Sequence, residues 1–538
     1  MQSFFKMGYL KVSAFLLAIS FFASCSNVPD TVESLPATTQ FVTVLNIPAI
    51  AEKGNFDEVK EFKSFKMASS ELKTESKELA ELFDGFMDDP ASSGIKLNSD
   101  AFVCLINETA SEKYMGLLLA LNDGDNFKEF LKKVFKAADQ NYDLGVSKEY
   151  GFNTVWIADE ALVAWDDHKA IFLSGLTYRA KRNLEFTMNE LFEGNEGGLV
   201  ANDSFNEFYS NKEDVSMWYS GDLIAEAMSM NPRAASLPLD KLEGSYLYTY
   251  LNFEEGEISV TAKFKPSEEL IEELGTDGSQ VASFNKDLVK YLPKKSLIAM
   301  SGAADMPLFA EAVKGNPSYD MMTGMVEGQL GISLDELYRS FGGSFVITLS
   351  DFTVIEVPYY PGSMEMEEKP LPEVNLVLDI TNKDLVPMLL KKFPPEMISN
   401  NGSYYEIRLD SSYKCYLNYN SDAVLVTTSL DAAKAFGKGG LDANLGDTVV
   451  GEQISENPFY MYLDLDFSRY PQEMVESSSV TNNPVAAGYI KTWNEFADGV
   501  EVKYQGDFTV QGTFRLKDEN NNSLFAIFKL MDTMVQDL

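Results

Sequence analysis

The 538-residue sequence contains a single histidine, His168, and only three cysteines. Zinc sites of the HExxH type need two histidines, and Ser-His-Asp or Cys-His catalysis needs a histidine held against a nucleophile. His168 follows Trp165-Asp166-Asp167 in a sequence typical of a hairpin turn, where a solvated turn residue is expected. The scarcity of these side chains argues against multi-histidine metal centres and nucleophilic triads.

Motifs for other chemistries are missing or incomplete. The sequence has no Gly-x-Ser-x-Gly elbow, Walker A loop or Gly-x-Gly-x-x-Gly fingerprint. Ser70-Glu71-Leu72-Lys73 fits the Ser-x-x-Lys pattern of penicillin-binding enzymes but lacks convincing partner motifs. Asn122-Asp123-Gly124-Asp125 lacks the later glutamate of a calcium loop and favours a strand-to-helix turn. We therefore expect no catalytic, cofactor-binding or metal-binding residues. The alternative is a pair of carboxylates, which suffices for a glycosidase.

Basic side chains are also few. The chain has 44 Lys and Arg residues against 82 Asp and Glu residues, a formal net charge of −38. Such a surface repels nucleic acid and anionic lipid headgroups, so neither is an expected partner. The 45% content of hydrophobic residues indicates a folded chain, and the acidic excess is explained by solubility.

No apolar run reaches the roughly 20 residues that a membrane-spanning helix needs. The N-terminus instead has the pattern of an export signal, in which Lys6 and Lys11 precede the apolar segment 12–23. Removal of residues 1–24 would leave 42 basic and 82 acidic side chains and a formal charge of −40, because only Lys6 and Lys11 are lost. The sequence therefore predicts a signal peptide over residues 1–24.

Small residues precede Cys25 at the end of this segment. Phe22-Ala23-Ser24-Cys25 resembles the lipobox of bacterial lipoproteins, which implies lipidation of Cys25 after cleavage. Several acyl chains on one cysteine hold a protein firmly to a membrane. Residues 25–34 are then expected to be the lipidated cysteine and a flexible tether. A plain secretory signal with an incidental cysteine is the alternative.

The rest of the sequence contains an internal duplication. Both halves have a Leu-Pro pair before a strand, a Gly-Ile-x-Leu segment, a strand–turn–helix unit, a short hairpin, and a long closing hairpin with alternating polarity. In this alignment Leu119 corresponds to Leu378, and His168 corresponds to Asp422. The sequence predicts an α+β protein with two tandem repeats, residues 35–290 and 291–538. Each is expected to be a mostly antiparallel sheet with helices packed on one face.

Three further expectations concern the cysteines, one acidic segment and the seam between the repeats. Cys104 and Cys415 lie in strand patterns at different places in the two repeats, so both are expected in the core, with a disulfide as the alternative. The acidic, proline-bounded segment 359–370 is expected to be an exposed loop that could contact a partner. A seam between two similar domains is a common ligand site, so binding is expected between the repeats.

The lipobox and the repeated motifs together resemble large Bacteroidota envelope lipoproteins classed as a domain of unknown function. The resemblance depends on three pairs of motifs: Leu35-Pro36 with Leu292-Pro293, the Gly94 and Gly331 segments, and sequences near Phe205 and Phe459 that approximate Asn-x-Pro-Phe. The resemblance implies an outer membrane lipoprotein that is periplasmic or surface-exposed.

We accordingly expect a non-enzymatic envelope lipoprotein with a binding or structural role. Its expected partners are the membrane, through the N-terminal lipid on Cys25, and an unknown protein or glycan. No cofactor, metal or nucleic acid is expected. Two alternatives remain: a carboxylate-dependent, glycosidase-like envelope hydrolase, and a surface module for glycan or protein capture.

Overall fold

The computed structural model forms two compact units. It describes residues 31–137, 144–147, 151–157, 160–194, 197–231, 239–276, 278, 282–314, 319–359, 363–409, 413–471 and 484–536. Unit 1 comprises residues 1–270 together with residues 518–538, and unit 2 comprises residues 271–517. The expected boundary at residues 290 and 291 concerns the sequence repeats, and the compact units are bounded differently.

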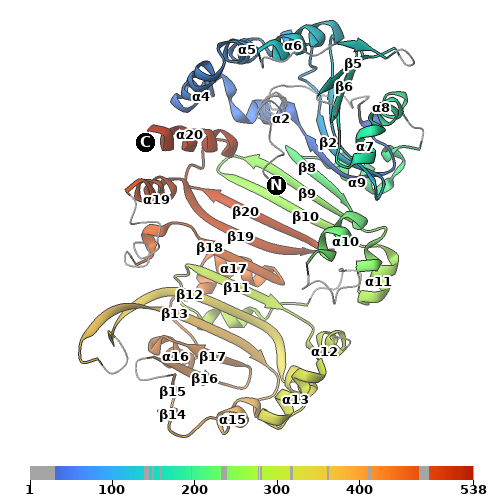
Figure 1. The fold of residues 1–538 in the computed structure, drawn as a ribbon. Coiled ribbons are helices and arrows are strands. Elements are labelled where there is room, and N and C mark those ends of the chain that lie inside the picture. The colour runs from blue at the N-terminus through green and yellow to red at the C-terminus, as the bar shows by residue number, and fades with distance from the viewer. Residues whose placement is uncertain are drawn as a thin grey trace. The chain divides into compact units, whose positions relative to one another are not determined.

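Unit 1 combines one antiparallel sheet with helices (Figure 1). Its strands are β1 (Thr39–Leu45), β2 (Ala101–Thr109), β3 (Glu112–Ala120), β4 (Gly145–Val146), β5 (Asn153–Ile157), β6 (Ala161–Trp165), β7 (Lys169–Gly175), β8 (Val215–Ser220), β9 (Tyr246–Glu254) and β10 (Glu257–Lys265). Its α-helices are α2 (Ile47–Gly54), α3 (Phe56–Val59), α4 (Lys63–Glu75), α5 (Lys77–Asp88), α6 (Gly124–Ala137), α7 (Tyr178–Arg182), α8 (Leu184–Glu193), α9 (Asp203–Ser210), α10 (Gly221–Ser229) and α20 (Ser523–Gln536). Its 3-10 helices are η1 (Val32–Ser34), η2 (Pro90–Ser93), η3 (Leu199–Ala201) and η5 (Leu239–Leu242). Helix α11 (Glu268–Leu274) contains the boundary between the units.

Unit 2 repeats this composition. Its strands are β11 (Ile298–Ala303), β12 (Phe341–Pro358), β13 (Met366–Ile380), β14 (Ile398–Asn400), β15 (Tyr405–Arg408), β16 (Lys414–Tyr419), β17 (Ala423–Thr427), β18 (Phe459–Asp464), β19 (Ala497–Gly506) and β20 (Thr509–Leu516). Its helices are η6 (Lys286–Tyr291), α12 (Met306–Lys314), α13 (Tyr319–Leu330), α14 (Leu334–Arg339), α15 (Leu385–Leu390), α16 (Leu430–Phe436), η7 (Leu445–Asp447), α17 (Val449–Glu456), η8 (Phe467–Arg469) and α19 (Pro484–Phe496). The α+β class expected from the sequence is confirmed.

The strand order is the same in both units, as an internal duplication requires. In unit 1 neighbouring strands follow the order β4-β5-β6-β7-β3-β2-β1-β8-β9-β10. In unit 2 the order is β14-β15-β16-β17-β13-β12-β11-β18-β19-β20. All of these pairings are antiparallel, and each strand of one unit has a counterpart at the same place in the strand order of the other.

The register agrees with the expected alignment near one hairpin turn. Leu119 pairs with Ala170 in unit 1, and Leu378 pairs with Val424 in unit 2. Beyond these pairs, the amide of Leu121 donates to the His168 carbonyl at 2.6 Å, and the equivalent amide of Ile380 donates to the Asp422 carbonyl at 3.0 Å. The alignment of Leu119 with Leu378, and of His168 with Asp422, is therefore confirmed.

The core of unit 1 lies on both faces of its sheet. All five residues of β6 are buried, and successive strand residues point to opposite faces. Trp165 belongs to a cluster with residues of α5 and α6, whereas Ala164 belongs to a cluster with residues of α8 and α9. The expectation of helices on one face is therefore corrected for unit 1, because fully buried strands need a covering layer on each side.

Unit 2 covers its sheet unevenly. One face carries a large cluster that includes η6, α16 and α17. The opposite face carries a small cluster of Ile380, Val386 and Val424, over which α15 packs. Helix α15 has 6 residues where α6 of unit 1 has 14, which explains the smaller cluster.

Two expected loops are shorter than the sequence suggests. Residues 31–34, expected in the tether, include the 3-10 helix η1, and Val32 and Ser34 are buried. The anchor residue Cys25 and the signal segment 1–24 lie outside the described residues. In the segment 359–370, residues 366–370 are part of β13, so this part of the expected loop extends a hairpin.

Candidate functional site

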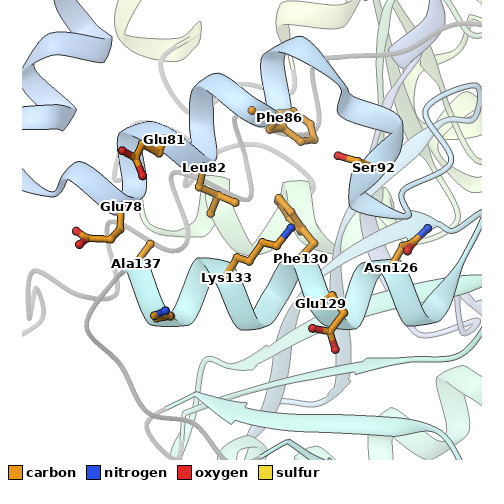
Figure 2. Close-up of a pocket in the computed structure, with 12 residues that line it drawn as sticks. Glu78, Glu81, Leu82, Phe86, Ser92, Asn126, Glu129, Phe130, Lys133 and Ala137 are labelled. Carbon is orange, nitrogen blue, oxygen red and sulfur yellow. The ribbon is translucent and has the colours of Figure 1, made fainter.

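A first cavity lies between α5 and α6 of unit 1 and has a volume of about 420 Å³ (Figure 2). Its lining includes three glutamates, Glu78, Glu81 and Glu129, and two lysines, Lys133 and Lys136. Carboxylates in a cavity are the feature that a glycosidase requires, so a carboxylate-dependent hydrolase would have its active site in a cavity of this kind.

The geometry of these glutamates does not match that requirement. Glu81 forms an exposed ion pair with Lys77 at 3.3 Å, and Glu129 pairs with Lys132 at 2.5 Å. Figure 2 shows the Glu129 side chain turned away from α5. The hydrogen bond from Lys132 lowers the pKa of Glu129, whereas a general acid needs a raised pKa. This cavity is therefore a solvated groove with paired charges.

Two adjoining cavities of unit 2, with volumes of about 610 and 680 Å³, contain one carboxylate between them. That carboxylate, Asp305, accepts a hydrogen bond from the amide of Leu308 at 3.0 Å and so caps the first turn of α12. The remaining lining is mostly apolar or small, with Arg339 as its cation. These cavities lack the acid pair that a carboxylate mechanism needs.

Two carboxyls of unit 1, Glu190 and Glu213, have a raised pKa outside these cavities. Burial raises the pKa of Glu190, and the neighbouring charges of Glu108 and Glu193 act in the same direction. Glu190 lines neither the cavity between α5 and α6 nor the two cavities of unit 2. Local burial therefore explains the raised pKa of Glu190, and the Glu190 side chain has no binding space beside it in those cavities.

A second cavity of unit 1, the apolar pocket, has a volume of about 510 Å³ and a different chemistry. Ser64 is the single residue of its lining with a polar side chain. The other lining residues are Ile50, Phe56, Val59, Phe62, Phe65, Ala68, Phe83, Val215, Phe253, Leu524, Phe528 and Met531. Ligand pockets generally combine this size with a mainly apolar lining.

Four short helices and the C-terminal helix build the apolar pocket. Helix α2 begins after Asn46, whose side chain accepts from the Ala49 amide at 3.3 Å, and Pro48 is tolerated in this first turn. Asn55 has a left-handed conformation with φ 46° and turns the chain from α2 into α3. Helix α20 contacts α2, α3 and α4 from a segment more than 400 residues away in sequence (Figure 1). The pocket is therefore the space that these short helices leave between them.

Aromatic contacts hold the pocket wall in place. The rings of Phe65 and Phe83 stack with centroids 5.5 Å apart, and those of Phe56 and Phe528 are also 5.5 Å apart. Such pairs are typically worth about 0.5–1.5 kcal/mol beyond the area that they bury. The helices are therefore held together by side chains that also line the space.

A partly buried ion pair holds the strands that contribute Val215 and Phe253 to this wall. The carboxylate of Asp214 is buried, binds Lys53 Nζ at 2.7 Å and accepts from the Phe253 amide at 2.6 Å. Lys53 Nζ also donates to the Asn252 side chain at 2.5 Å. These bonds fix β8 and β9 under the pocket, and no ionisable side chain is part of its lining.

His168 is an exposed turn residue, as the sequence predicts. Its amide donates to the Asp166 carboxylate at 2.7 Å, and the amide of Asp422 donates in the same way to Asn420 at 2.9 Å. The two turns therefore have equivalent side-chain bonds although only one contains a histidine, which favours a structural explanation of its position.

Both described cysteines are free thiols. Cys104 is fully buried, and this burial raises its pKa to about 12, although a hydrogen bond with the Gly116 backbone acts in the opposite direction. Cys415 is partly buried, which also raises its pKa. Neither thiol has the lowered pKa of a nucleophilic cysteine.

The described residues also bear on metal binding and membrane insertion. Within the described ranges, no three His, Cys, Asp or Glu side chains are grouped as a metal ion would require. In that part of the chain, no helix has the length and apolar character needed to cross a bilayer.

The apolar pocket was not predicted from the sequence, because its walls come from opposite ends of the chain. The available signal was the last segment, where Leu524, Phe525, Phe528 and Met531 follow the spacing of an apolar helix face. That segment lies beyond the closing hairpin of the second repeat, and its place in unit 1 depends on tertiary packing.

No curated protein matches the chain. Crystal form III of TP0453 is similar at 11% identity, over 45% of this chain and 81% of that chain, with a TM-score of 0.28. Crystal form I of TP0453 is similar at 12% identity, over 45% and 81% of the two chains, with a TM-score of 0.27. Likeness at this level supports no statement about fold or function.

A family model gives a more extensive match. It covers residues 32–524 and therefore both repeats. Its span also includes every lining residue of the apolar pocket except Phe528 and Met531. The chain belongs to the family described as "Domain of unknown function (DUF4836)".

Proposed function

We propose that this protein is a non-enzymatic envelope lipoprotein that binds an apolar ligand, or the apolar part of a larger one, in the apolar pocket of unit 1. The observation that carries the proposal is the lining, which has twelve apolar residues and Ser64. Apolar surface removed from water contributes roughly 25 cal/mol per Å². A hydrocarbon group gains this contribution in the pocket without leaving any of its own polar groups unpaired.

The same lining disfavours polar ligands. A buried hydroxyl, amide or charge without a hydrogen-bond partner costs about 1–3 kcal/mol or more in a protein. The lining offers the Ser64 side chain as its single polar group, so a sugar would lose most of its hydrogen bonds to water on entry. The proposed ligand therefore keeps any polar group outside the pocket.

A binding role is preferred to hydrolysis because the acids of the cavity between α5 and α6 are not arranged as a catalytic pair. Two of its three glutamates, Glu81 and Glu129, take part in exposed ion pairs. The apolar pocket contains no carboxylate that could act as an acid, a base or a nucleophile. The ligand would then be bound and released without chemical change.

The cellular setting remains part of the proposal. Lipidation of Cys25 would tether unit 1 to the outer membrane, close to a large source of acyl chains. The periplasmic and surface-exposed faces are both compatible with this anchor. Replacement of Cys25 by Ala should abolish metabolic lipid labelling, and labelling that survives the change would contradict the lipoprotein assignment.

Ligand binding can be tested by titrating the mature chain with N-phenyl-1-naphthylamine, an apolar fluorophore that brightens when it leaves water. We expect saturable binding of one probe per chain and competition by long-chain fatty acids or alkyl glucosides. Soluble oligosaccharides are the matched polar control and should not compete. The absence of saturable binding, or competition by sugars alone, would contradict the proposal.

A further inference from the structure

The C-terminal helix forms one wall of the apolar pocket. Helix α20 follows the last strand of unit 2 in sequence, yet residues 518–538 belong to unit 1. Leu524, Phe528 and Met531 all line the pocket. Their spacing of four and three residues places them on one face of the helix. The pocket is therefore bounded on one side by a terminal helix, which can move without breaking the chain path through the sheet.

Burial decreases along this helix. Phe525 and Ala526, near its start, are 5% and 4% exposed, whereas Met531 is 55% exposed. The Phe525 ring lies 5.9 Å from the Phe62 ring, next to the buried end. Fewer apolar contacts make opening of the second half of the helix less costly than opening of the first.

The first part of the segment is held by hydrogen bonds to the backbone of unit 1. The Gly256 amide donates to the Asn521 carbonyl at 3.0 Å, and the Asn522 side chain donates to the Phe253 carbonyl at 2.7 Å. The Asn522 side chain also accepts from the Leu524 amide at 3.0 Å, which caps α20. Residues 521–526 are therefore a fixed pivot.

The far end has a polar contact of a different kind. The Asp532 carboxylate accepts a hydrogen bond from the Ser64 amide at 2.6 Å. Ser64 lies in the first turn of α4, and the N-cap residue Phe62 has no side chain that could bond to the free amides there. Asp532 thus caps α4 from another helix, and the positive end of the α4 dipole favours its charge. This bond joins the far end of α20 to α4, in addition to the ring contact between Phe528 and Phe56.

We infer that the second half of α20, residues 528–536, is a lid that pivots about residues 521–526 to admit the ligand and is latched by Asp532 on the α4 N-terminus. This inference rests on the proposed function and adds the route by which the ligand enters and leaves. Opening the lid moves Phe528 and Met531 out of the pocket wall and leaves the sheet intact.

A reversible cross-link tests the lid directly. Ser64→Cys and Asp532→Cys would place two thiols at the latch of a chain produced without residues 1–25, with Cys415→Ser to remove the other partly exposed thiol. Stopped-flow mixing with N-phenyl-1-naphthylamine then measures binding in the oxidised and reduced forms. We expect the association rate to collapse on oxidation and to recover after reduction.

The outcomes separate the lid from the proposed function. Equal association rates in the oxidised and reduced forms would overturn the lid and leave the apolar pocket as the binding site. If the unaltered mature chain also fails to bind the probe, both the lid and the proposed function are wrong. The oxidised and reduced forms are the same variant, so a difference in folding between variants cannot affect their comparison.

A latch variant gives a second test without cysteines. Asp532→Ala removes one helix cap, and loss of this cap should speed association and dissociation of the probe by about fivefold. Thr533→Ala is the matched control, because the Thr533 hydroxyl bonds to the Lys529 carbonyl of its own helix. Unchanged rates for Asp532→Ala with a lowered melting temperature would show a purely structural cap and overturn the latch.

Discussion

A tryptophan at position 68 should block the apolar pocket with little effect on folding. Ala68 lines the pocket but is exposed on α4, so a larger side chain there can enter the space without displacing core residues. A tryptophan side chain buries about 150–250 Å² when it is enclosed. If it excludes the ligand from about 100 Å² of wall, the loss at roughly 25 cal/mol per Å² is about 2.5 kcal/mol. That free energy corresponds to a roughly 70-fold larger dissociation constant, and therefore to weaker binding.

The assay is a fluorescence titration of the Ala68→Trp chain with N-phenyl-1-naphthylamine, beside thermal denaturation of the same sample. Met67→Trp is the matched control, because Met67 is 43% exposed on the same helix and does not line the pocket. We expect similar melting temperatures for the two variants and weakened binding for Ala68→Trp alone. Equal affinities in both variants would refute the assignment of the binding site.

Three further predictions concern packing and ionisation. Gly116→Ala would place a Cβ 2.7 Å from the Cys104 sulfur and should destabilise unit 1 by about 1–3 kcal/mol in urea unfolding. The control is Gly85→Ala within α5, where an added Cβ would have no neighbouring atom within 4 Å outside the helix's own backbone, and it should stabilise unit 1 by about 0.5–1 kcal/mol. Equal changes in unfolding free energy for the two variants would contradict the close packing of Gly116 in β3 against Cys104. Because burial raises the Cys104 pKa to about 12, its thiol should react with a disulfide reagent at pH 8 only after unfolding, and rapid labelling of native protein would contradict that burial. Hydrogen bonds from two β10 lysines lower the pKa of Glu207, so its contribution to stability is complete above the unfolded pKa and is lost as pH falls through the folded pKa. Glu207→Gln should therefore flatten the acid-side decline in the urea midpoint, and an unchanged slope would show that the pair contributes nothing.

The repeated sheet could be predicted from sequence because its signals are local. Strand–turn–helix units, alternating hairpins and the Gly-Ile-x-Leu segments recur in the same order in both halves, and the observed strand order is identical. The equivalence of His168 with Asp422 follows because both residues sit in turns closed by an Asx side chain, Asp166 or Asn420. Patterns within a few residues are enough for such inferences.

The helix layers were harder to predict. Helices were expected on one face of the sheet, yet all residues of β6 are buried, so side chains of other elements must pack on both faces. Apolar runs in strands show burial but do not show which helix supplies the cover. The same limit applies to the binding site, which was expected at the seam between repeats and is now proposed within unit 1. No local pattern connects α20 with helices near residue 60.

The most direct test of the central proposal is photo-crosslinking with an alkyl diazirine probe, followed by mass spectrometry of the labelled peptides. We predict saturable labelling concentrated in residues 50–68 and 524–531, the two segments that supply most of the lining of the apolar pocket. Excess unlabelled fatty acid should remove this labelling. Labelling spread over the chain, or concentrated in unit 2, would contradict the proposal that the apolar pocket of unit 1 is the binding site.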